Sequence, residues 1–290
     1  MMTWTLVSQP DLSEQQFGQW RELLRERAGV RLNENQKQFL QSQVTMRMRE
    51  VGEQDIASYF SHISDASEGR LEWSILIDRL VVKETSFFRH QPSLNYVCAH
   101  LQNKIVQQNI VDNFDIWSVG CATGEEAYTL AMLVNEAFEL AKIDPYFGVL
   151  ATDISRAAIS VARSGQFSAR KLSFVPSSFR FKYFTELGRD MHKFDHELID
   201  KMCFSTANVL HTDGMPNLLF DVIYCQNMLV YFDQDLRHNL LDSMVNRLKP
   251  SGLLVIGLGE VTSWKHEAVE RVNRADVQVY QKHANGPVSE

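Results

Sequence analysis

The chain has 290 residues, of which 44% are hydrophobic and 22% charged, a composition typical of ordinary globular domains. Basic residues number 29 and acidic residues 36, and the resulting net charge of −7 argues against a nucleic-acid partner. No apolar run approaches the length of a membrane span, and the start of the chain lacks the basic segment of a signal peptide, so we expect neither membrane insertion nor secretion.

The cysteines and histidines predict neither disulfides nor a metal site. Cys98, Cys121, Cys203 and Cys225 are scattered and form no Cys-x-x-Cys pair, which is typical of reduced core residues in a cytoplasmic protein. The nine histidines show no spacing of metal ligands. We therefore expect a cytoplasmic protein without a metal.

Residues 1–80 are predicted to form an all-α N-terminal domain. Asp11 or Ser13 caps the first helix, which ends at Gly29 and carries an apolar stripe. Further helices are predicted at about 35–50, 56–63 and 71–80. Because this region contains no glycine-rich loop and no catalytic constellation, its pattern favours recognition of a partner.

The second of these helices carries a group of basic side chains. Lys37, Arg47 and Arg49 lie on it, and no acidic residue occurs between Asn35 and Arg49. A few charges on a helix most often form a solvated face. The alternative is a basic surface suited to an acidic partner.

Residues 83–90, Lys-Glu-Thr-Ser-Phe-Phe-Arg-His, combine two adjacent phenylalanines with a charged tip. One interpretation is a linker between helices with packed aromatic rings. The functional interpretation is that Thr85 and Arg89 reach into a neighbouring ligand site. The pattern alone leaves both open.

The stretch from Phe114 to Glu126 predicts a buried strand, a glycine turn and the first turn of a helix. The apolar run to Val119 is short and rich in strand-forming residues, and helix formers follow from residue 125. Gly120 and Gly124 bracket small residues, which allows a ligand to approach the backbone. This order builds nucleotide sites in α/β folds, although a structural corner with solvated glutamates fits as well.

The residues of this turn disfavour a dinucleotide. Gly-x-x-x-Gly lacks the central glycine that admits a pyrophosphate, which argues against a nicotinamide dehydrogenase. Glu125 and Glu126 are favourable at a helix N-terminus but would repel a phosphate. They suit a cationic ligand such as S-adenosylmethionine, which has an ammonium group, a sulfonium and no phosphate.

Further strands and helices follow in alternation. A strand at 147–153 ends in Asp153, the position at which an acid typically binds ribose hydroxyls. Additional strands are predicted at 203–209, 220–227, 253–259 and 277–282, the last antiparallel, with helices at 156–163 and 235–248 and a turn at 249–252. Residues 166–202 are too long for a plain connection and predict an insertion, either a small β element or a helical hairpin. The tail after His283 is predicted to be disordered.

Six segments in register resemble one family. They are Glu84–Arg89, Gly124–Tyr128, Ala151–Ile154, Asn208–Leu210, Cys225–Phe232 and Leu248–Gly252. These segments are similar to those of the CheR-type chemoreceptor glutamate methyltransferases, and the likeness covers nearly the whole chain. Residues 83–90 most resemble the branch linked to type IV pilus motility.

The resemblance implies an α/β fold in which a class I, Rossmann-like methyltransferase domain over residues 81–290 follows the all-α domain. It also implies a small β-subdomain inserted at about 166–202. S-adenosylmethionine would donate the methyl group to glutamates in the cytoplasmic helical bundle of methyl-accepting chemoreceptors. The positions that match the family's cofactor residues are Thr85, Arg89, Gly120, Glu126, Asp153, Asn208, Val209, Gln226 and Asn227. Arg89 and Tyr231 match residues close to the site of methyl transfer, and we expect them to be catalytic.

The chain departs from the family pattern at several positions. Lys83 and Gln226 stand where the family usually has asparagine and arginine, and Gln43 stands where a helix arginine is common. The insertion between Phe184 and Cys203 is shorter than in members that grip a receptor's C-terminal pentapeptide. We therefore expect receptor contact without such a tether.

Two other functions agree with these patterns. One is a methyltransferase that acts on another carboxylate or on a small molecule. The other is a non-catalytic adaptor that keeps the fold and binds S-adenosylmethionine. The presence of the glycines and of Asp153 favours an enzyme over an adaptor.

Overall fold

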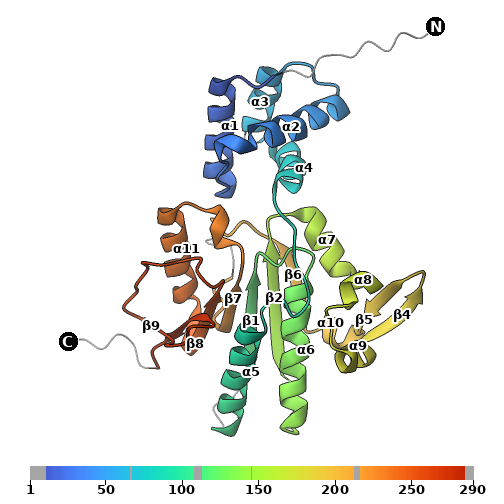
Figure 1. The fold of residues 1–290 in the computed structure, drawn as a ribbon, viewed down its shortest axis with the longest axis vertical. Coiled ribbons are helices and arrows are strands. Elements are labelled where there is room, and N and C mark those ends of the chain that lie inside the picture. Colours follow the sequence, from blue (N-terminus) through green and yellow to red (C-terminus); the bar gives the residue numbers. More distant parts are fainter. Residues whose placement is uncertain (1–10, 66, 108–112, 145, 212–215, 285–290) are drawn as a thin grey trace. The chain divides into compact units, whose positions relative to one another are not determined.

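The computed structural model describes residues 11–65, 67–107, 113–144, 146–211 and 216–284 (Figure 1). The chain divides into two compact units, one ending at Val82 and the other beginning at Lys83. Each unit has a hydrophobic core of its own. The predicted tail after His283 lies, from residue 285 onward, outside the described residues.

The first unit is all-helical, as its sequence predicts. Its elements are α1 (Glu14–Ala28), the 3-10 helix η1 (Glu34–Gln36), α2 (Lys37–Val51), α3 (Ile56–Ser64) and α4 (Arg70–Leu80). Ser13 caps α1 in a reciprocal capping box with Gln16, and Gly29 ends this helix in the left-handed conformation. Trp20, Leu40 and Tyr59 are buried where the helices meet.

Arg47 joins helices of this unit instead of presenting its charge to solvent. Its Nε and Nη2 donate to the two carboxylate oxygens of Glu72 on α4, at 2.8 and 2.7 Å. The hydroxyl of Tyr59 donates to the same carboxylate at 2.6 Å. Burial raises the pKa of Glu72, but the hydrogen bonds from Arg47 and Tyr59 outweigh it, so that the pKa lies below its ordinary value.

The alternative of a local basic surface on α2 is therefore wrong for Arg47 and Lys37, whose charges are paired. The Arg47 side chain is 16% exposed and fully engaged, and Lys37 pairs with Glu14 at 2.5 Å. Arg49 is exposed. Of the three basic residues, Arg49 is the one whose charge faces solvent without an ion pair among the described residues.

The second unit contains a seven-stranded sheet in the order β6-β2-β1-β7-β8-β10-β9. Its strands are β1 (Phe114–Val119), β2 (Phe147–Asp153), β6 (Met202–Thr206), β7 (Phe220–Cys225), β8 (Leu248–Ile256), β9 (Val269–Arg271) and β10 (Gln278–Lys282). The first five strands in the sheet order are parallel, and β10 is antiparallel to both of its neighbours. The predicted Rossmann-like class is confirmed.

Helices cover both faces of this sheet (Figure 1). They are α5 (Gln91–Val106), α6 (Glu125–Leu140), α7 (Arg156–Ser164) and α11 (Gln234–Asn246). Along β1 the side chains alternate, so that Ile116 packs with α5, α6 and α7, whereas Trp117 packs with α11. The sheet is thus buried on both sides, as parallel sheets usually are.

The insertion after α7 forms a small subdomain. It contains β3 (Gln166–Ser168), α8 (Ala169–Leu172), α9 (Ser177–Tyr183), β4 (Phe184–Gly188), β5 (Met191–Phe194) and α10 (His196–Ile199). The three strands form an antiparallel sheet in the order β3-β5-β4. The predicted β element is therefore confirmed, and the helical hairpin is wrong. Its aromatic core, with Phe167, Phe184 and Phe194, packs against Tyr128 of α6.

Several predicted boundaries differ from the structure. The third predicted strand ends at Thr206, so that Asn208 and Val209 lie in the following loop. The predicted turn at 249–252 lies within β8, where the register against β7 shifts and Ser251 adopts a φ of +62°. Helix α5 and strand β9 were not predicted. Cys203 is exposed, so it is not a core residue as predicted.

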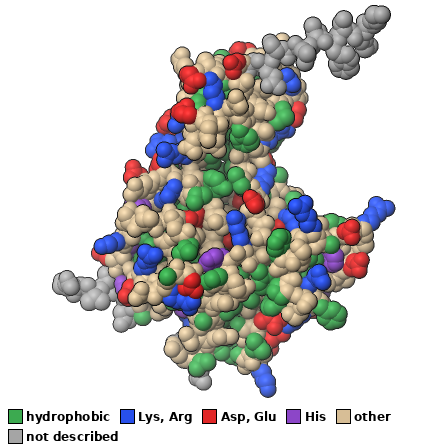
Figure 2. All heavy atoms as spheres, in the orientation of Figure 1, with side chains coloured by type: hydrophobic (Ala, Val, Ile, Leu, Met, Phe, Trp, Pro, Cys, Tyr) green, Lys and Arg blue, Asp and Glu red, His purple; other side chains and the backbone are tan. Residues whose placement is uncertain are grey.

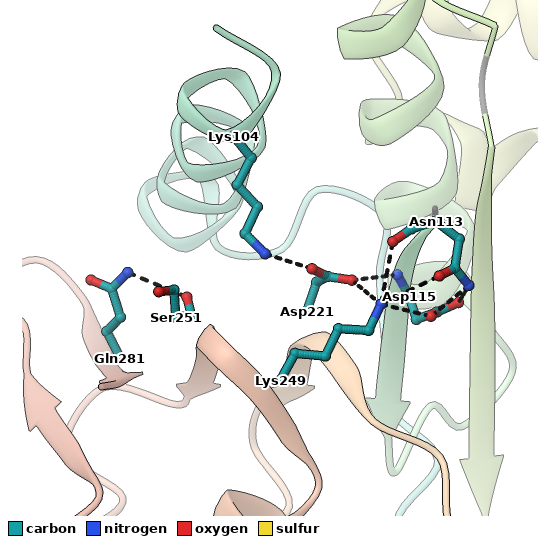
Figure 3. A network of polar contacts seen from close by, with 7 residues as sticks. All are labelled: Lys104, Asn113, Asp115, Asp221, Lys249, Ser251 and Gln281. Carbon is teal, nitrogen blue, oxygen red and sulfur yellow. Dashed lines mark hydrogen bonds and ion pairs between the residues drawn. The ribbon is translucent and has the colours of Figure 1, made fainter. Parts of the chain in front are cut away.

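An ion-pair network closes the amino ends of the strands (Figure 3). Asp221, with a side chain 6% exposed, accepts from Lys104 at 2.6 Å and from Lys249 at 2.7 Å. It also accepts from the N–H of Asp115 at 2.9 Å. Burial raises the pKa of Asp221, but the hydrogen bonds from the two lysines outweigh it and the pKa is lowered. This network lies at the opposite end of the strands from the predicted ligand residues.

Other features narrow the kinds of site that the described residues form. None of the described helices is both long and apolar enough to cross a membrane. Within the same residues, no three His, Cys, Asp or Glu side chains gather as metal ligands would. On the face drawn in Figure 2, Lys and Arg side chains are dispersed among Asp and Glu.

Candidate active site

The predicted ligand residues gather at the carboxyl ends of the parallel strands. β1 lies between β2 and β7, and the strand order reverses beside it. Ligands of open α/β sheets bind at such a reversal, outside the carboxyl ends of the strands. Gly120 directly follows β1, Asp153 ends β2, and Gln226 with Asn227 follows β7.

The turn after β1 is held tightly against β2. The N–H groups of Gly120 and Cys121 both donate to the carbonyl oxygen of Thr152, at 2.8 and 3.0 Å. Gly120 has a φ of +72°, and a Cβ at this position would come within 2.8 Å of the sulfur of Met228. The backbone conformation therefore favours glycine here, and a larger residue would also have to displace the Met228 side chain.

Asp153 joins this turn to the next helix. Its Oδ2 accepts from the N–H of Ala122 at 2.9 Å, and its Oδ1 accepts from the N–H of Ser155 at 2.8 Å. Ala122 has a φ of +48°, an uncommon conformation that this hydrogen bond supports. A carboxylate accepts about four hydrogen bonds, so Asp153 can also receive hydroxyl donors from a ligand.

The two glutamates that open α6 have different environments. The carboxylate of Glu125 is fully buried and pairs with Lys171 of α8. Thr123 donates to the same carboxylate at 2.7 Å, and Lys171 donates to Thr123 at 2.9 Å. Glu125 therefore fastens the insertion to the turn after β1, and the predicted alternative of solvated glutamates is wrong for this residue.

Glu126 faces the carboxyl end of the sheet. Its Oε1 accepts from the hydroxyl of Ser118 at 2.7 Å. Although part of the side chain is accessible, burial of the carboxylate raises the pKa of Glu126 to about 8. The charge of Arg89 opposes this shift, and that of Glu260 adds to it. A carboxylate withdrawn from water in this way is stabilised by a cationic ligand.

The segment that carries Arg89 is anchored to the insertion. The Phe87 ring packs edge-on against Phe167 at 4.9 Å and Phe184 at 5.7 Å between centroids. Phe88, with a φ of +51°, packs edge-on against Phe179 at 5.3 Å. The predicted packing of aromatic rings in this linker is therefore correct. The contacts of Phe87 and Phe88 fix the backbone position of the adjacent Arg89.

Arg89 itself is exposed at the site. Its Nη1 donates to the carbonyl oxygen of Glu84 at 3.2 Å, which orients the guanidinium. Its charge lowers the pKa of Glu126 and of Tyr231, so these three groups lie within electrostatic reach of one another. Thr85, four residues earlier, is half-buried.

Tyr231 lies on the 3-10 helix η3 (Leu229–Tyr231) and is 36% exposed. Burial raises the pKa of Tyr231 above its ordinary value, so the phenol stays protonated near neutral pH. Asn227, four residues before it, is exposed and has a φ of +59°. The turn between β7 and α11 thus presents an amide and a phenol at the carboxyl end of the sheet.

The side chains of three other predicted residues already make contacts within the protein. The amide nitrogen of Gln226 donates to the hydroxyl of Ser93 on α5 at 2.9 Å, which turns this side chain toward the core. Asn208 accepts from the N–H of Leu210 at 3.1 Å, and the Val209 side chain packs against the core on the α11 face.

Two site-forming residues were missed by the sequence prediction. Lys171 pairs with Glu125 across the insertion, and nothing in the local pattern distinguishes it from a surface lysine. Glu260 follows β8 and is 5% exposed. The position of Glu260 could have indicated a site residue, because it follows the carboxyl end of β8, and Asp153 lies at the carboxyl end of β2.

Comparisons with known proteins agree with this geometry. Residues 83–279 match the family model described as the CheR methyltransferase, SAM binding domain, and residues 15–81 match the CheR methyltransferase, all-alpha domain. A protein of Pseudomonas aeruginosa named chemotaxis protein methyltransferase 2 is 30% identical over 86% of this chain and 87% of its own length. A chemotaxis protein methyltransferase of Borreliella burgdorferi is 28% identical over 80% of this chain and 83% of its own length.

S-adenosylmethionine is therefore the cofactor, and the residues at the site fit it. The withdrawn carboxylate of Glu126 suits the cationic methionine part, and the half-buried carboxylate of Asp153 suits ribose hydroxyls. The turn after β1 carries Glu125 and Glu126 and would repel a phosphate, which S-adenosylmethionine lacks.

Proposed function

The chain belongs to the CheR methyltransferase family, and from this premise we propose that it methylates glutamate side chains of methyl-accepting chemotaxis receptors. The donor is S-adenosylmethionine. The observation that carries the proposal is the grouping of Glu126, Arg89 and Tyr231 at the carboxyl end of the sheet. A carboxylate that suits the cationic donor, together with a cation and a phenol that suit an anionic acceptor, supports methyl transfer to a carboxylate.

The roles of the cofactor-binding residues follow from their positions. We assign the methionine part to Glu126, and the ribose to Asp153. Asn208 and Val209 belong to the loop that follows β6, and Asn227 belongs to the turn that follows β7. We assign these three residues further contacts with the cofactor. Gln226 contributes through its position in the backbone, since its amide nitrogen is engaged with Ser93. Gly120 allows the close packing of these loops, and Thr85 with Arg89 approaches from the anchored segment.

The reaction needs orientation more than it needs proton transfer. When bound, S-adenosylmethionine supplies a methyl group on a positively charged sulfur. A receptor glutamate has an ordinary pKa near ~4.3, so its carboxylate is already a nucleophile at neutral pH. Arg89 and the Tyr231 hydroxyl orient this carboxylate, and the surrounding loops exclude water. Arg89 must hold it loosely, because a strongly paired oxygen is a weaker nucleophile.

We propose that the receptor is recognised through its cytoplasmic methylation helices, with α2 of the first unit contributing Arg49. No C-terminal peptide is needed as a tether. A peptide could add to the insertion sheet along β4, which has five residues and a bulge next to Gly188. Glu186 on this strand and Arg189 and Asp190 in the turn carry charges, which disfavour strand addition.

The test of the proposal is tritiated methyl transfer to a purified receptor fragment, compared with a panel of small carboxylic acids. Transfer to the receptor alone is the expected result, and transfer confined to the small acids would favour a small-molecule methyltransferase. A protein that binds the cofactor in calorimetry and methylates neither would be an adaptor. Methylation that collapses when the receptor's tail is removed would contradict the absence of a tether.

A further inference from the structure

Ser93 is a fully buried serine in the first turn of α5 that the assigned cofactor and acceptor roles do not use. Its hydroxyl has a partner on each side. The amide Nε2 of Gln226 donates to Ser93 Oγ at 2.9 Å, and Ser93 Oγ lies 2.8 Å from Nδ1 of His90. The hydroxyl thus has one partner for each of its capacities, as acceptor and as donor.

The direction of this chain of hydrogen bonds follows from its fixed donors. The backbone N–H of Ser93 donates to the same Nδ1 of His90 at 3.3 Å, so this ring nitrogen carries no proton. The Ser93 hydroxyl therefore donates to His90 and accepts from Gln226. Nε2 of Gln226 also lies 3.4 Å from the carbonyl oxygen of Ile256, which can only accept, and this contact fixes the orientation of the amide.

The two ends of the chain adjoin the two segments that carry predicted site residues. His90 is the N-cap of α5 and directly follows Arg89. Gln226 follows β7 and directly precedes Asn227. Because Ser93 and Gln226 lie 133 residues apart in the chain, the buried hydroxyl forms a tertiary link between these two segments.

The Arg89 segment is also held on the other side of Arg89. The N–H of Phe88 donates to the hydroxyl of Thr129 on α6 at 3.3 Å, and the Phe88 ring packs against Phe179 of the insertion. Arg89 therefore lies between a residue that is anchored to α6 and a residue that is anchored, through Ser93, to the turn after β7. Since its side chain is long and exposed, the position of its backbone decides which groups the guanidinium can reach.

We propose that Ser93 is a positioning residue, whose hydroxyl joins the Arg89 segment to the turn after β7 and so sets the places of Arg89 and Asn227 relative to each other. Its effect on cofactor binding is independent of the identity of the acceptor, because both residues are assigned to the cofactor. Its effect on turnover rests on the function proposed above.

The test uses Ser93→Ala, which removes the bridging hydroxyl and keeps a good helix former in α5. Tyr183→Phe is the matched control, because the Tyr183 hydroxyl also bridges an amide and an acceptor. It accepts from Asn135 at 3.0 Å and donates to Glu136 at 2.7 Å, which joins α9 to the middle of α6. Calorimetry with S-adenosylmethionine should show roughly fivefold weaker binding in Ser93→Ala and native affinity in Tyr183→Phe. Native affinity in a folded Ser93→Ala protein, or equal losses in the two variants, would overturn the proposal.

A double-mutant cycle with Arg89→Ala separates positioning from a general loss of stability. If Ser93 acts through Arg89, Arg89→Ala costs less cofactor affinity in Ser93→Ala than in the native protein, because the guanidinium is already displaced. Losses that multiply independently would mean that the hydroxyl stabilises the fold without placing Arg89, and would count against the proposal.

His90 supplies a second pair of variants, which decides the role of the chain should Ser93→Ala fail to fold. His90→Asn keeps an acceptor two bonds from Cβ, where Nδ1 lies, and asparagine is a favourable N-cap, so this variant should retain the cofactor affinity. His90→Ala loses the acceptor and should bind the cofactor more weakly. Equal affinity of the two His90 variants would overturn the proposal.

If the native protein binds the cofactor but leaves receptors unmethylated, the proposed function fails. The binding comparisons of Ser93→Ala with Tyr183→Phe, and of His90→Ala with His90→Asn, still decide the positioning role.

Discussion

The Oδ2 of Asp153 lies 2.9 Å from the backbone nitrogen of Ala122, so the carboxylate that ends β2 holds the turn that follows β1. A second bond, to the N–H of Ser155, joins the same side chain to the start of α7. Asp153 therefore shapes the cofactor site in addition to the ribose contact that we assign to it.

Asp153→Ala is expected to weaken cofactor binding by roughly 1–3 kcal/mol, the usual cost of leaving buried donors unpaired. Calorimetry with S-adenosylmethionine measures it. Asp200→Ala is the control, because it removes the same charge from an exposed position just before β6, at the other end of the parallel strands. An unchanged dissociation constant in Asp153→Ala would remove the assignment.

We expect Glu126 to make cofactor binding dependent on pH. In the free protein burial raises the pKa of this carboxyl to about 8, and a bound cation favours its charged form. Below the free pKa a proton must therefore leave on binding, so affinity falls as pH decreases, by up to about tenfold per pH unit. Above it the group is already ionised, and affinity levels off.

Calorimetry in two buffers with different ionisation enthalpies measures this release, and we expect close to one proton per cofactor at about pH 7. Glu126→Gln, which cannot ionise, should bind more weakly and lose this proton release. Equal affinity of the native protein at pH values on both sides of the pKa would mean that Glu126 does not meet the cationic part of the cofactor.

Arg89 and Lys83 lie on the same segment but are expected to differ in importance. Arg89 acts on both Glu126 and Tyr231, so Arg89→Ala should lower kcat/KM by roughly 10²-fold, as removal of a single transition-state donor often does. Lys83→Ala, a matched loss of charge, should have little effect. Steady-state methylation rates distinguish them, and equal losses would reduce the segment to a structural linker.

The local parts of the site could be predicted from the sequence, because each lies at a strand end or at the start of the helix that follows. Gly120, Glu126 and Asp153 belong to this group. Contacts between distant segments could not be predicted from the sequence, because the charge and size of a side chain are compatible with many partners. Lys171 pairs with Glu125 across 46 residues, and Arg47 meets Glu72 across 25. Because Arg47 pairs with Glu72, its charge is not available for the receptor contact that the basic residues of α2 had suggested.

This pairing changes which arginine can be tested for receptor contact. Arg49→Glu should raise the receptor KM and leave cofactor affinity unchanged, because Arg49 is exposed on α2. The effect should shrink with added salt, since exposed charges are screened beyond about 8 Å at physiological ionic strength. Arg47→Glu should instead destabilise the first unit, because it sets two carboxylates against each other. Native receptor KM in Arg49→Glu at low salt would show that this face makes no receptor contact.

Peptide mapping after methyl transfer tests most directly whether this chain esterifies receptor glutamates. A receptor's cytoplasmic fragment is incubated with the protein and S-adenosylmethionine, digested and analysed by mass spectrometry. We expect a gain of one methylene on glutamates of the methylation helices. Mild alkali should release the added methyl group as methanol, as a methyl ester requires. An unmodified receptor fragment, or an added methyl group that resists alkali, would contradict esterification of the receptor glutamates.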